Sequence, residues 1–523
     1  MESILTKENL SEWEGMEEGQ LTSKVAKTAE VATKQMEFSY DSEFKRSLAS
    51  VMCKRWPNAS SSLRKGFCII LRCLCREKKV IDCLLSRNLM ENVIGSTGLP
   101  SCCEADLPQE ERIEAVKCLI NAFFHHKPSI NVFIELQSMN GLSAATVKEK
   151  DAEKRYLLLH LIFVVSARSD QAQDHWRGDG PLVHLLCEEA MKWEKVSHFI
   201  FLTILLANRL LQLPKNADEA LKVLFNLFCH CNGKGDEAIF EECLQMTRKI
   251  LLTVPRGSTQ IQNVVNLLGC LPINIEFFYP KLEEGESREF SFDDRSMKVA
   301  QVIMDDLGDR LSTEKWEGVE ILGTYFTFLI ISASASKSVR RYCRMKIMPP
   351  LHASDVERPP ERGDTMRNKI IRVIQSSSQP KELASQFLYV LSKRSVPRLI
   401  KYTGLGNAAG LLANSGLLGR INEGRRASDS EDSETEDYRE VEEKVNPVTG
   451  YVREERPDPM ADMSEEQKMY EAEKLMSAMD RLMGEGFIKP GTIGPDGKPM
   501  EVSHVLELVK NAKTPEGSDD ESD

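Results

Sequence analysis

The sequence lacks the signals that direct a chain into or across a membrane. Its first twenty residues contain no basic flank followed by an apolar run, so they do not predict a signal peptide. The longest apolar stretches, such as Phe199–Ala207, fall far short of the roughly 20 residues that a membrane-spanning helix needs. Residue 2 is Glu2 rather than the glycine of a myristoylation site, and no C-terminal cysteine is available for prenylation. We therefore expect a cytoplasmic protein without direct membrane insertion.

An excess of positive charge is also missing. The 523 residues include 68 Lys and Arg against 80 Asp and Glu, which gives a net charge of −12. Non-specific binding to nucleic acid needs a positive surface that offsets the phosphates. The charge balance therefore argues against a nucleic-acid partner.

The motifs of enzymes that bind nucleotides or carry out hydrolysis are absent. The glycine-rich stretch Gly491–Lys498 comes nearest to a phosphate loop, but its spacing is wrong and Pro499 stands where a hydroxyl residue is required. There is no G-x-S-x-G, no H-E-x-x-H, no kinase set and no dinucleotide fingerprint. We expect a protein with no catalytic residues and no cofactor, which acts by binding another protein.

The cysteines do not follow a metal-binding pattern. Fourteen are present, and many lie within apolar helical patterns, as expected of reduced, buried thiols. The cluster Cys229, His230 and Cys231, with Cys243 downstream, lacks the usual C-x₂-C spacing. We interpret it as core packing and predict no metal site.

Apolar residues recur three and four positions apart in many segments of the first four-fifths of the chain. In Glu111–His126 they cover more than one helix face, as in a helix packed between neighbours. No run of alternating strand pattern is visible. Many helices of roughly 12–20 residues in succession predict an all-α, armadillo/HEAT-like α-solenoid over residues 1–420.

Three segments place an asparagine between two apolar runs. They are KCLINAFFHH, KVLFNLFCHC and NVVNLLGCLP, with Asn121, Asn226 and Asn266. In armadillo-like arrays such an amide faces the concave side and can bond the backbone of a bound peptide. The alternative is a hydrogen bond to a neighbouring repeat, which for any single asparagine is at least as well supported.

The composition changes after residue 420. Residues 428–437, SDSEDSETED, hold six acids with no base and no apolar residue, which predicts disorder. We expect an acidic linker at 421–463, an amphipathic helix at 464–484 and a flexible acidic tail at 485–523. A capping box at Ser464–Gln467 begins the helix, and methionines line one of its faces. That face predicts either an adaptable partner surface or a helix that docks on its own solenoid.

Several collinear motifs resemble the synembryn family (resistance to inhibitors of cholinesterase). The longest is SVPRLIKYTGLGNAAGLLA at Ser395–Ala413; others are LRCLCRE, KVLFN, VNLLG, MPPL, MRNKIIR, VNPVTGYV and PMADMSEEQKMYEAEKL. Together they span residues 71 to 508.

The resemblance implies an armadillo/HEAT-like solenoid that binds heterotrimeric G-protein α subunits as a guanine-nucleotide exchange factor and folding chaperone. Members prefer the GDP-bound or nascent α subunit, stabilise its nucleotide-free state and release it on GTP binding. The C-terminal helix of the α subunit lies in the concave groove, and the distal helix contacts the GTPase domain. A casein-kinase-type enzyme phosphorylates the acidic region. We expect a monomer that the α subunit can recruit to the cell cortex or plasma membrane.

Residue roles follow from the resemblance position by position. Groove residues would be Arg72, Arg76, Asn121, Asn226 and Asn266, with Arg341 and Arg344 as a basic patch at the other end. The distal helix would bind through Leu475, Met476, Met479 and Leu482. Ser428 and Ser433 resemble the phosphorylated positions, with Ser430 and Thr435 beside them, although the order of serines and acids departs from the family pattern.

The competing interpretation is an armadillo-type scaffold or adaptor that binds a helical peptide without exchange activity. An import-receptor groove needs tryptophans at repeat spacing, and the five tryptophans of this chain show none.

Overall fold

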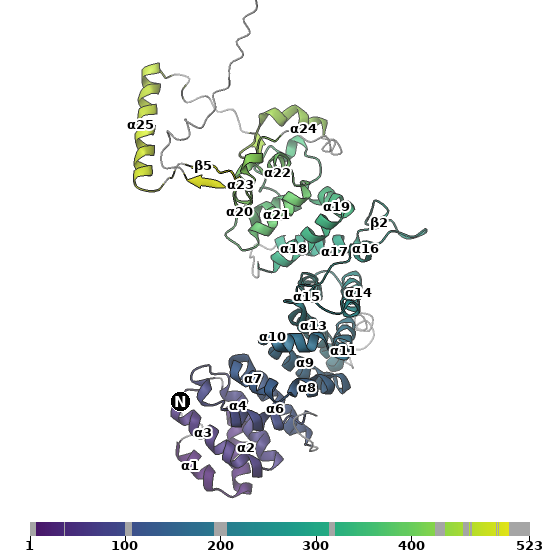
Figure 1. Cartoon of the computed structure of the whole chain (residues 1–523), viewed down its shortest axis with the longest axis vertical. Coiled ribbons are helices and arrows are strands. Elements are labelled where there is room, and N and C mark those ends of the chain that lie inside the picture. The colour runs from purple at the N-terminus through teal and green to yellow at the C-terminus, as the bar shows by residue number, and fades with distance from the viewer. Residues whose placement is uncertain are drawn as a thin grey trace, which may run out of the picture. The chain divides into compact units, whose positions relative to one another are not determined.

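The structure is a computed structural model that describes residues 7–35, 37–99, 107–192, 207–312, 320–423, 435–452, 460, 463–487, 489 and 491–501. It contains two compact units, Met1–Asn274 and Ile275–Asp523, which we describe separately (Figure 1). Both are built from helices, which confirms the predicted all-α, armadillo/HEAT-like class.

The helices of the first unit form two stacks. The first stack, in which each helix packs on the next, contains α2 (Glu18–Lys34), α4 (Ser61–Leu74), α6 (Gln109–His125), α9 (Ala152–Ser166), α13 (Ala207–Phe228) and α15 (Thr259–Leu268). The second contains α3 (Ser42–Arg55), α5 (Arg87–Gly95), α7 (Lys127–Glu135), α8 (Ser138–Lys148), α11 (Gly180–Met191) and α14 (Glu237–Thr253). The remaining helices are α1 (Lys7–Gly15), α10 (Asp170–Arg177) and the 3₁₀ turns η1 (Trp56–Asn58) and η2 (Ile81–Cys83).

Local sequence explains why these helices start where they do and pack as they do. The Ser60 hydroxyl accepts a hydrogen bond from the Leu63 amide and caps α4, and the Asp151 carboxylate caps α9 in the same way. α4 buries Phe67, Ile70 and Leu71, among others, against both neighbours in the stack. Because each helix is covered on two sides, its apolar residues occupy more than one face, as the periodicity predicted.

The second unit repeats this layering. Its stacked helices are α18 (Glu320–Ala335), α21 (Lys381–Leu391) and α23 (Leu405–Asn414). The other elements are α16 (Ile275–Phe278), α17 (Lys298–Ser312), α19 (Lys337–Ile347), η4 (Ala353–Asp355), α20 (Met366–Gln375), α22 (Val396–Thr403), η5 (Leu418–Arg420), α24 (Glu436–Val441), η7 (Glu442–Lys444) and α25 (Glu465–Gly484).

Three antiparallel hairpins lie within the described part of the second unit. They pair β1 (Ser291–Phe292) with β2 (Arg295–Ser296), β3 (Val445–Asn446) with β4 (Tyr451–Val452), and β5 (Gly491–Ile493) with β6 (Pro499–Glu501). The sequence showed no strand pattern because strands of two or three residues are too short to display an alternation.

Part of the region expected to be an acidic linker is folded. Residues 435–452 form α24, η7 and the β3–β4 hairpin, and Tyr438 is buried with the Lys401 ammonium 4.2 Å from its ring centroid. The Asp437 carboxylate accepts a hydrogen bond from the Ala353 amide at 3.0 Å, which is the largest cause that lowers its pKa to about 2. The candidate phosphorylation sites Ser428, Ser430 and Ser433 lie outside the described residues.

The distal helix begins as its capping box predicts. The Ser464 hydroxyl accepts from the Gln467 amide, and the Gln467 side chain accepts in return from the Ser464 amide. None of the residues of α25, all of which the structure describes, is buried.

Candidate partner-binding surfaces

A row of polar side chains connects neighbouring helices of the first stack, and we call it the polar ladder. At its first step, Arg72 of α4 has its Nε 3.3 Å from the Glu114 carboxylate of α6, and Lys117 pairs with the same carboxylate at 2.8 Å. The Asn121 amide donates to the Arg72 carbonyl oxygen at 3.0 Å. These contacts join α6 to α4 and hold the Arg72 guanidinium in one place.

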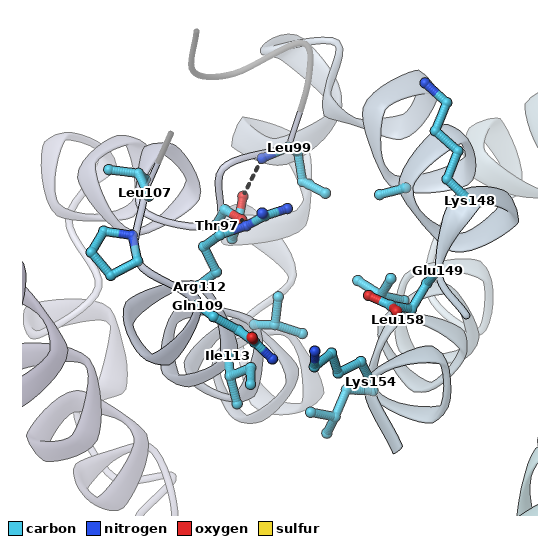
Figure 2. A pocket seen from close by; sticks show the side chains of 14 residues that line it. Thr97, Leu99, Leu107, Gln109, Arg112, Ile113, Lys148, Glu149, Lys154 and Leu158 are labelled. Carbon is cyan, nitrogen blue, oxygen red and sulfur yellow. Dashed lines mark hydrogen bonds between the residues drawn. The ribbon is translucent and has the colours of Figure 1, made fainter. Parts of the chain in front are cut away.

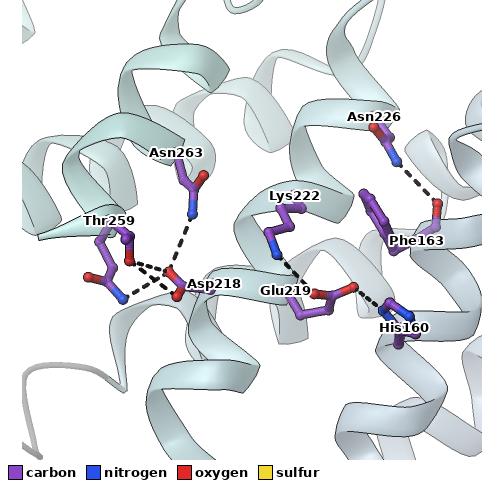
Figure 3. A network of polar contacts seen from close by, with 9 residues as sticks. His160, Phe163, Asp218, Glu219, Lys222, Asn226, Thr259 and Asn263 are labelled. Atoms are coloured by element: carbon purple, nitrogen blue, oxygen red, sulfur yellow. Dashed lines mark hydrogen bonds and ion pairs between the residues drawn. The ribbon is translucent and has the colours of Figure 1, made fainter. Parts of the chain in front are cut away.

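The same arrangement recurs between α9 and α13 (Figure 3). The Glu219 carboxylate of α13 accepts from His160 Nδ1 at 2.7 Å, and Lys222 lies 3.4 Å from its other oxygen. The buried Asn226 amide donates to the Phe163 carbonyl oxygen at 3.2 Å and to the Ser166 hydroxyl at 3.1 Å. Lys222 follows Glu219 by three positions in the helix, as Lys117 follows Glu114, so both steps use the same helix geometry.

The asparagines therefore serve the stack in the structure. Asn121 and Asn226 each bond the helix before them, which is the neighbouring-repeat alternative. Asn266 lies partly exposed on α15, where its carbonyl accepts from the Gly269 amide at the helix end. Contact of any of the three with a partner stays a prediction.

Aromatic side chains lie beside the ladder, and the sequence analysis missed them. Tyr156, His160 and Phe163 stack along one face of α9, with ring centroids 5.8 and 5.9 Å apart. Phe124 at the end of α6 is 51% exposed, and the Arg168 guanidinium lies 5.5 Å from its ring centroid. The spacing of four and three residues on α9 was the available signal, since it places all three rings on one face.

Asp218 forms a second polar node on α13 (Figure 3). Its carboxylate accepts from Gln260 Nε2 at 2.8 Å, from Asn263 Nδ2 at 3.3 Å and from the Thr259 hydroxyl at 3.3 Å. Burial raises the pKa of this carboxyl despite these donors. The node ties α15 to α13 and extends the ladder by one helix.

The predicted basic residues differ in their exposure. Arg76 is exposed and donates to the Gln35 carbonyl oxygen at 2.9 Å. Arg341 is partly exposed, 4.0 Å from the Asp293 carboxylate, whereas Arg344 is only 9% exposed. Burial, then the neighbouring Arg394 and Arg341, lower the pKa of Arg340, which marks a concentration of positive charge around α19.

Two cavities lie beside the stacked helices. One, of about 720 Å³, is lined by apolar side chains such as Leu99, Ile113 and Leu158 and by the basic Arg112 and Lys154 (Figure 2). The other, of about 730 Å³, runs along α21 and α23 between residues such as Tyr389 and Leu411.

The apolar face of α25 is open to solvent. Met476 is 65% and Met479 is 45% exposed, and Leu475 and Leu482 are exposed as well. The apolar side chains of an amphipathic helix with no buried residue are not stabilised by packing on the rest of the protein. This face is therefore available to a partner.

In the part of the chain that the structure describes, no helix is long and apolar enough to cross a membrane. Among the same residues, no three His, Cys, Asp or Glu side chains are grouped as a metal site would require.

The protein has stacked helices, a row of polar and aromatic side chains along one stack, and an exposed amphipathic helix. These features define a helical-repeat binding protein of the armadillo/HEAT type. Residues 69–498 match the family described as guanine nucleotide exchange factor synembryn. The chain belongs to this family. It is 33% identical over 500 residues to "Chaperone ric-8" of Caenorhabditis elegans, covering 85% of this chain and 86% of that protein. It is 32% identical over 482 residues to "Chaperone Ric-8A" of Danio rerio, covering 87% of both.

Two solved structures are similar at low identity. An engineered protein has a TM-score of 0.47 at 13% identity, covering 81% of this chain and 85% of that one. A structure from a study of the interaction between cadherin and beta-catenin has a TM-score of 0.48 at 11% identity, covering 79% and 70%.

Proposed function

We propose that this protein binds heterotrimeric G-protein α subunits and serves them as a guanine-nucleotide exchange factor and folding chaperone. The observation that carries the proposal is the family match over residues 69–498, which includes the polar ladder, most of the second unit and α25. The related proteins are named as chaperones, which agrees with a protein that binds a partner through the polar ladder and α25.

The first contact in this proposal is between the C-terminal helix of the α subunit and the polar ladder. A helix C-terminus carries partial negative charge and a terminal carboxylate, so it is attracted to arginine and lysine. Arg72, Lys117 and Lys222 supply such charges, and the α9 aromatic rings supply an apolar surface beside them. The predicted groove residues Arg76, Asn121, Asn226, Asn266, Arg341 and Arg344 remain part of this proposal.

The second contact is between α25 and the GTPase domain. Its exposed methionines are flexible and polarizable, which suits a surface that changes shape during nucleotide release. Two contacts on one chain give the second a high effective concentration once the first has formed.

Exchange then follows from linkage alone. If the protein binds the nucleotide-free α subunit more tightly than the GDP-bound form, it lowers the affinity for GDP by the same factor. GTP reverses the process when it binds the empty site tightly enough to displace the protein.

A casein-kinase-type enzyme would act on the acidic segment. Ser428 and Ser433 each have a glutamate three positions downstream, which fits a kinase that reads acids. Thr435 differs, because its hydroxyl donates to the Leu351 carbonyl oxygen in the structure. We place the protein in the cytoplasm, as a monomer recruited to membranes through its partner.

The test is GDP release from a panel of purified α subunits. Faster release from at least one of them, with a stable nucleotide-free complex, is expected. Binding of the α-subunit tail peptide without faster release would favour the adaptor interpretation instead.

A further inference from the structure

Two chain segments, one before α25 in the sequence and one after it, contact the two ends of helix α23. Within the described residues, α23 has no capping side chain of its own, although its first amides need acceptors. The Leu405 amide donates to the Pro447 carbonyl oxygen at 2.8 Å, and the Gly406 amide donates to that of Val448 at 2.9 Å. The turn of the β3–β4 hairpin therefore caps the start of α23.

Glycines allow this approach. A Cβ at Gly404 would lie 2.9 Å from the Thr449 carbonyl carbon, and one at Gly450 would lie 3.0 Å from the Gly404 nitrogen. Both glycines have a positive φ, 78° and 77°, which other residues rarely adopt. The Val452 amide also donates to the Val356 carbonyl oxygen at 2.7 Å. We call these contacts the first anchor.

The other end of α23 meets the hairpin that follows α25. Just after α23, the Leu418 amide donates to the Gly497 carbonyl oxygen at 3.4 Å. A Cβ at Gly497 would collide with the Gly416 carbonyl oxygen, and one at Gly416 would collide with that of Asp496. The glycine-rich stretch Gly491–Lys498, which is not a phosphate loop, thus forms strand β5 and the turn of the β5–β6 hairpin, and the turn packs against Gly416. We call this the second anchor.

We infer that α25 is carried on a strap fixed at both ends of α23, and that the β5–β6 hairpin is a positioning element for this partner-binding helix. Twelve positions separate Val452 from Ser464, and ten separate Gly484 from Gly494. At about 3.4 Å per residue, the two connections reach at most about 40 Å and about 34 Å. The helix itself has 20 residues and spans about 30 Å. Both ends of α25 are therefore restricted, whereas a free tail would restrict only one.

The two anchors are unequal in the contacts that hold them. The first combines three backbone hydrogen bonds of 2.7–2.9 Å with the buried Tyr438 and the Asp437 contact at Ala353. The second has a single backbone bond of 3.4 Å beside the paired glycines. The second anchor is therefore the weaker of the two.

The role of the strap in holding an α subunit rests on the proposed function, but the anchor can be tested without a partner. Gly497→Ala is compared with Gly486→Ala, which serves as a matched control. Both glycines have a φ of 73–77°, so both substitutions carry the same backbone strain, but nothing lies within 4 Å of a Cβ at Gly486. A chain ending at Phe487 keeps α25 and removes the hairpin.

Hydrogen exchange over residues 417–421 of the free protein is the first measurement. Exchange about tenfold faster is expected in Gly497→Ala and in the shortened chain, with Gly486→Ala like the wild type. Equal exchange in the shortened chain and the full chain would show that the hairpin makes no contact there, and the inference would fail.

Dissociation of a nucleotide-free α subunit is the second measurement. Loss of the second anchor should speed it roughly threefold to tenfold, because α25 then searches a larger volume. Unchanged dissociation, together with altered exchange, would reduce the hairpin to a structural cap and overturn its positioning role. If no variant and no wild-type protein bound an α subunit, the proposed function would fail while the exchange result still decided the anchor.

Discussion

At the scale of single residues, side chains of the polar ladder are needed both to bond the neighbouring helix and, in the proposed function, to contact a partner. Asn226 illustrates this, because its motif predicts a peptide contact and its amide also bonds the Phe163 carbonyl oxygen of the preceding helix. The Phe163 carbonyl oxygen also accepts from the Ala167 amide at 2.9 Å and from the Ser166 hydroxyl at 3.1 Å, so Asn226 belongs to a network at the end of α9. The stability of the stack therefore constrains which ladder residues are free to meet a partner.

Asn226→Ala should lower the free energy of unfolding by about 1–3 kcal/mol, since it removes two hydrogen bonds, to the Phe163 carbonyl oxygen and to the Ser166 hydroxyl, each worth about 0.5–1.5 kcal/mol. Asn414→Ala is the control, because its amide bonds the exposed Glu382 carboxylate at 3.4 Å, and a change within about 0.5 kcal/mol is expected. Urea denaturation measures both. Equal stability of the two variants would mean that the Asn226 bond contributes nothing.

His126 should make the stability sensitive to mild acid. It is buried where α6 meets α7, its Nδ1 lies 2.6 Å from the Ser129 hydroxyl, and burial lowers its pKa. The unfolded chain therefore takes up a proton more readily, so the free energy of unfolding falls as pH drops below about 6.5 and levels off past the folded pKa.

His126→Gln should flatten that dependence between pH 6.5 and 5. The comparison with wild type cancels the opposite contribution of His184, whose pKa the Glu242 carboxylate raises. Denaturation at several pH values is the measurement, and identical slopes in the two proteins would rule out His126 as the titrating group.

At the scale of elements, prediction from sequence worked where the determinants are local. α25 begins and ends within a residue of the predicted bounds, because its signals are local: a capping box at its start, Gly484 at its end and Gly486 just beyond. The polar ladder was predicted only in part, since Asn226 and Phe163 are far apart in the chain. The fold of residues 435–452 was not predicted because it also depends on contacts between distant residues. The Pro447 and Val448 carbonyl oxygens accept from the first amides of α23, and composition does not reveal such a contact.

Met476→Ser with Met479→Ser should weaken α-subunit binding about tenfold without changing the melting temperature. Neither side chain is buried, so the fold loses no packing, whereas an apolar partner surface loses its counterpart. Lys474→Ala, on the charged face beside Glu471, is the control and should bind like the wild type. A parallel fall in melting temperature would show that the methionines pack on the protein itself.

At the scale of the whole molecule, the C-terminal segments do two separable jobs. Residues 435–452 complete the fold of the second unit, and residues beyond them carry the distal helix. A chain ending at Arg420 loses both segments. Lower exchange activity in that chain could therefore come either from lower stability of the second unit or from the missing distal helix. A chain ending at Val452 keeps Tyr438 and the turn that caps α23.

The chain ending at Val452 should melt like the full chain, bind the α-subunit tail peptide, and release little GDP, because only the first of two contacts remains. The chain ending at Arg420 should melt several degrees lower, since the Leu405 and Gly406 amides lose their acceptors and Lys401 loses the Tyr438 ring. Calorimetry and nucleotide release on the same three proteins separate the two jobs. Equal melting temperatures of the two shortened chains would mean that residues 435–452 do not stabilise the second unit. If the chain ending at Val452 promoted GDP release as fast as the full chain does, α25 would have no part in exchange.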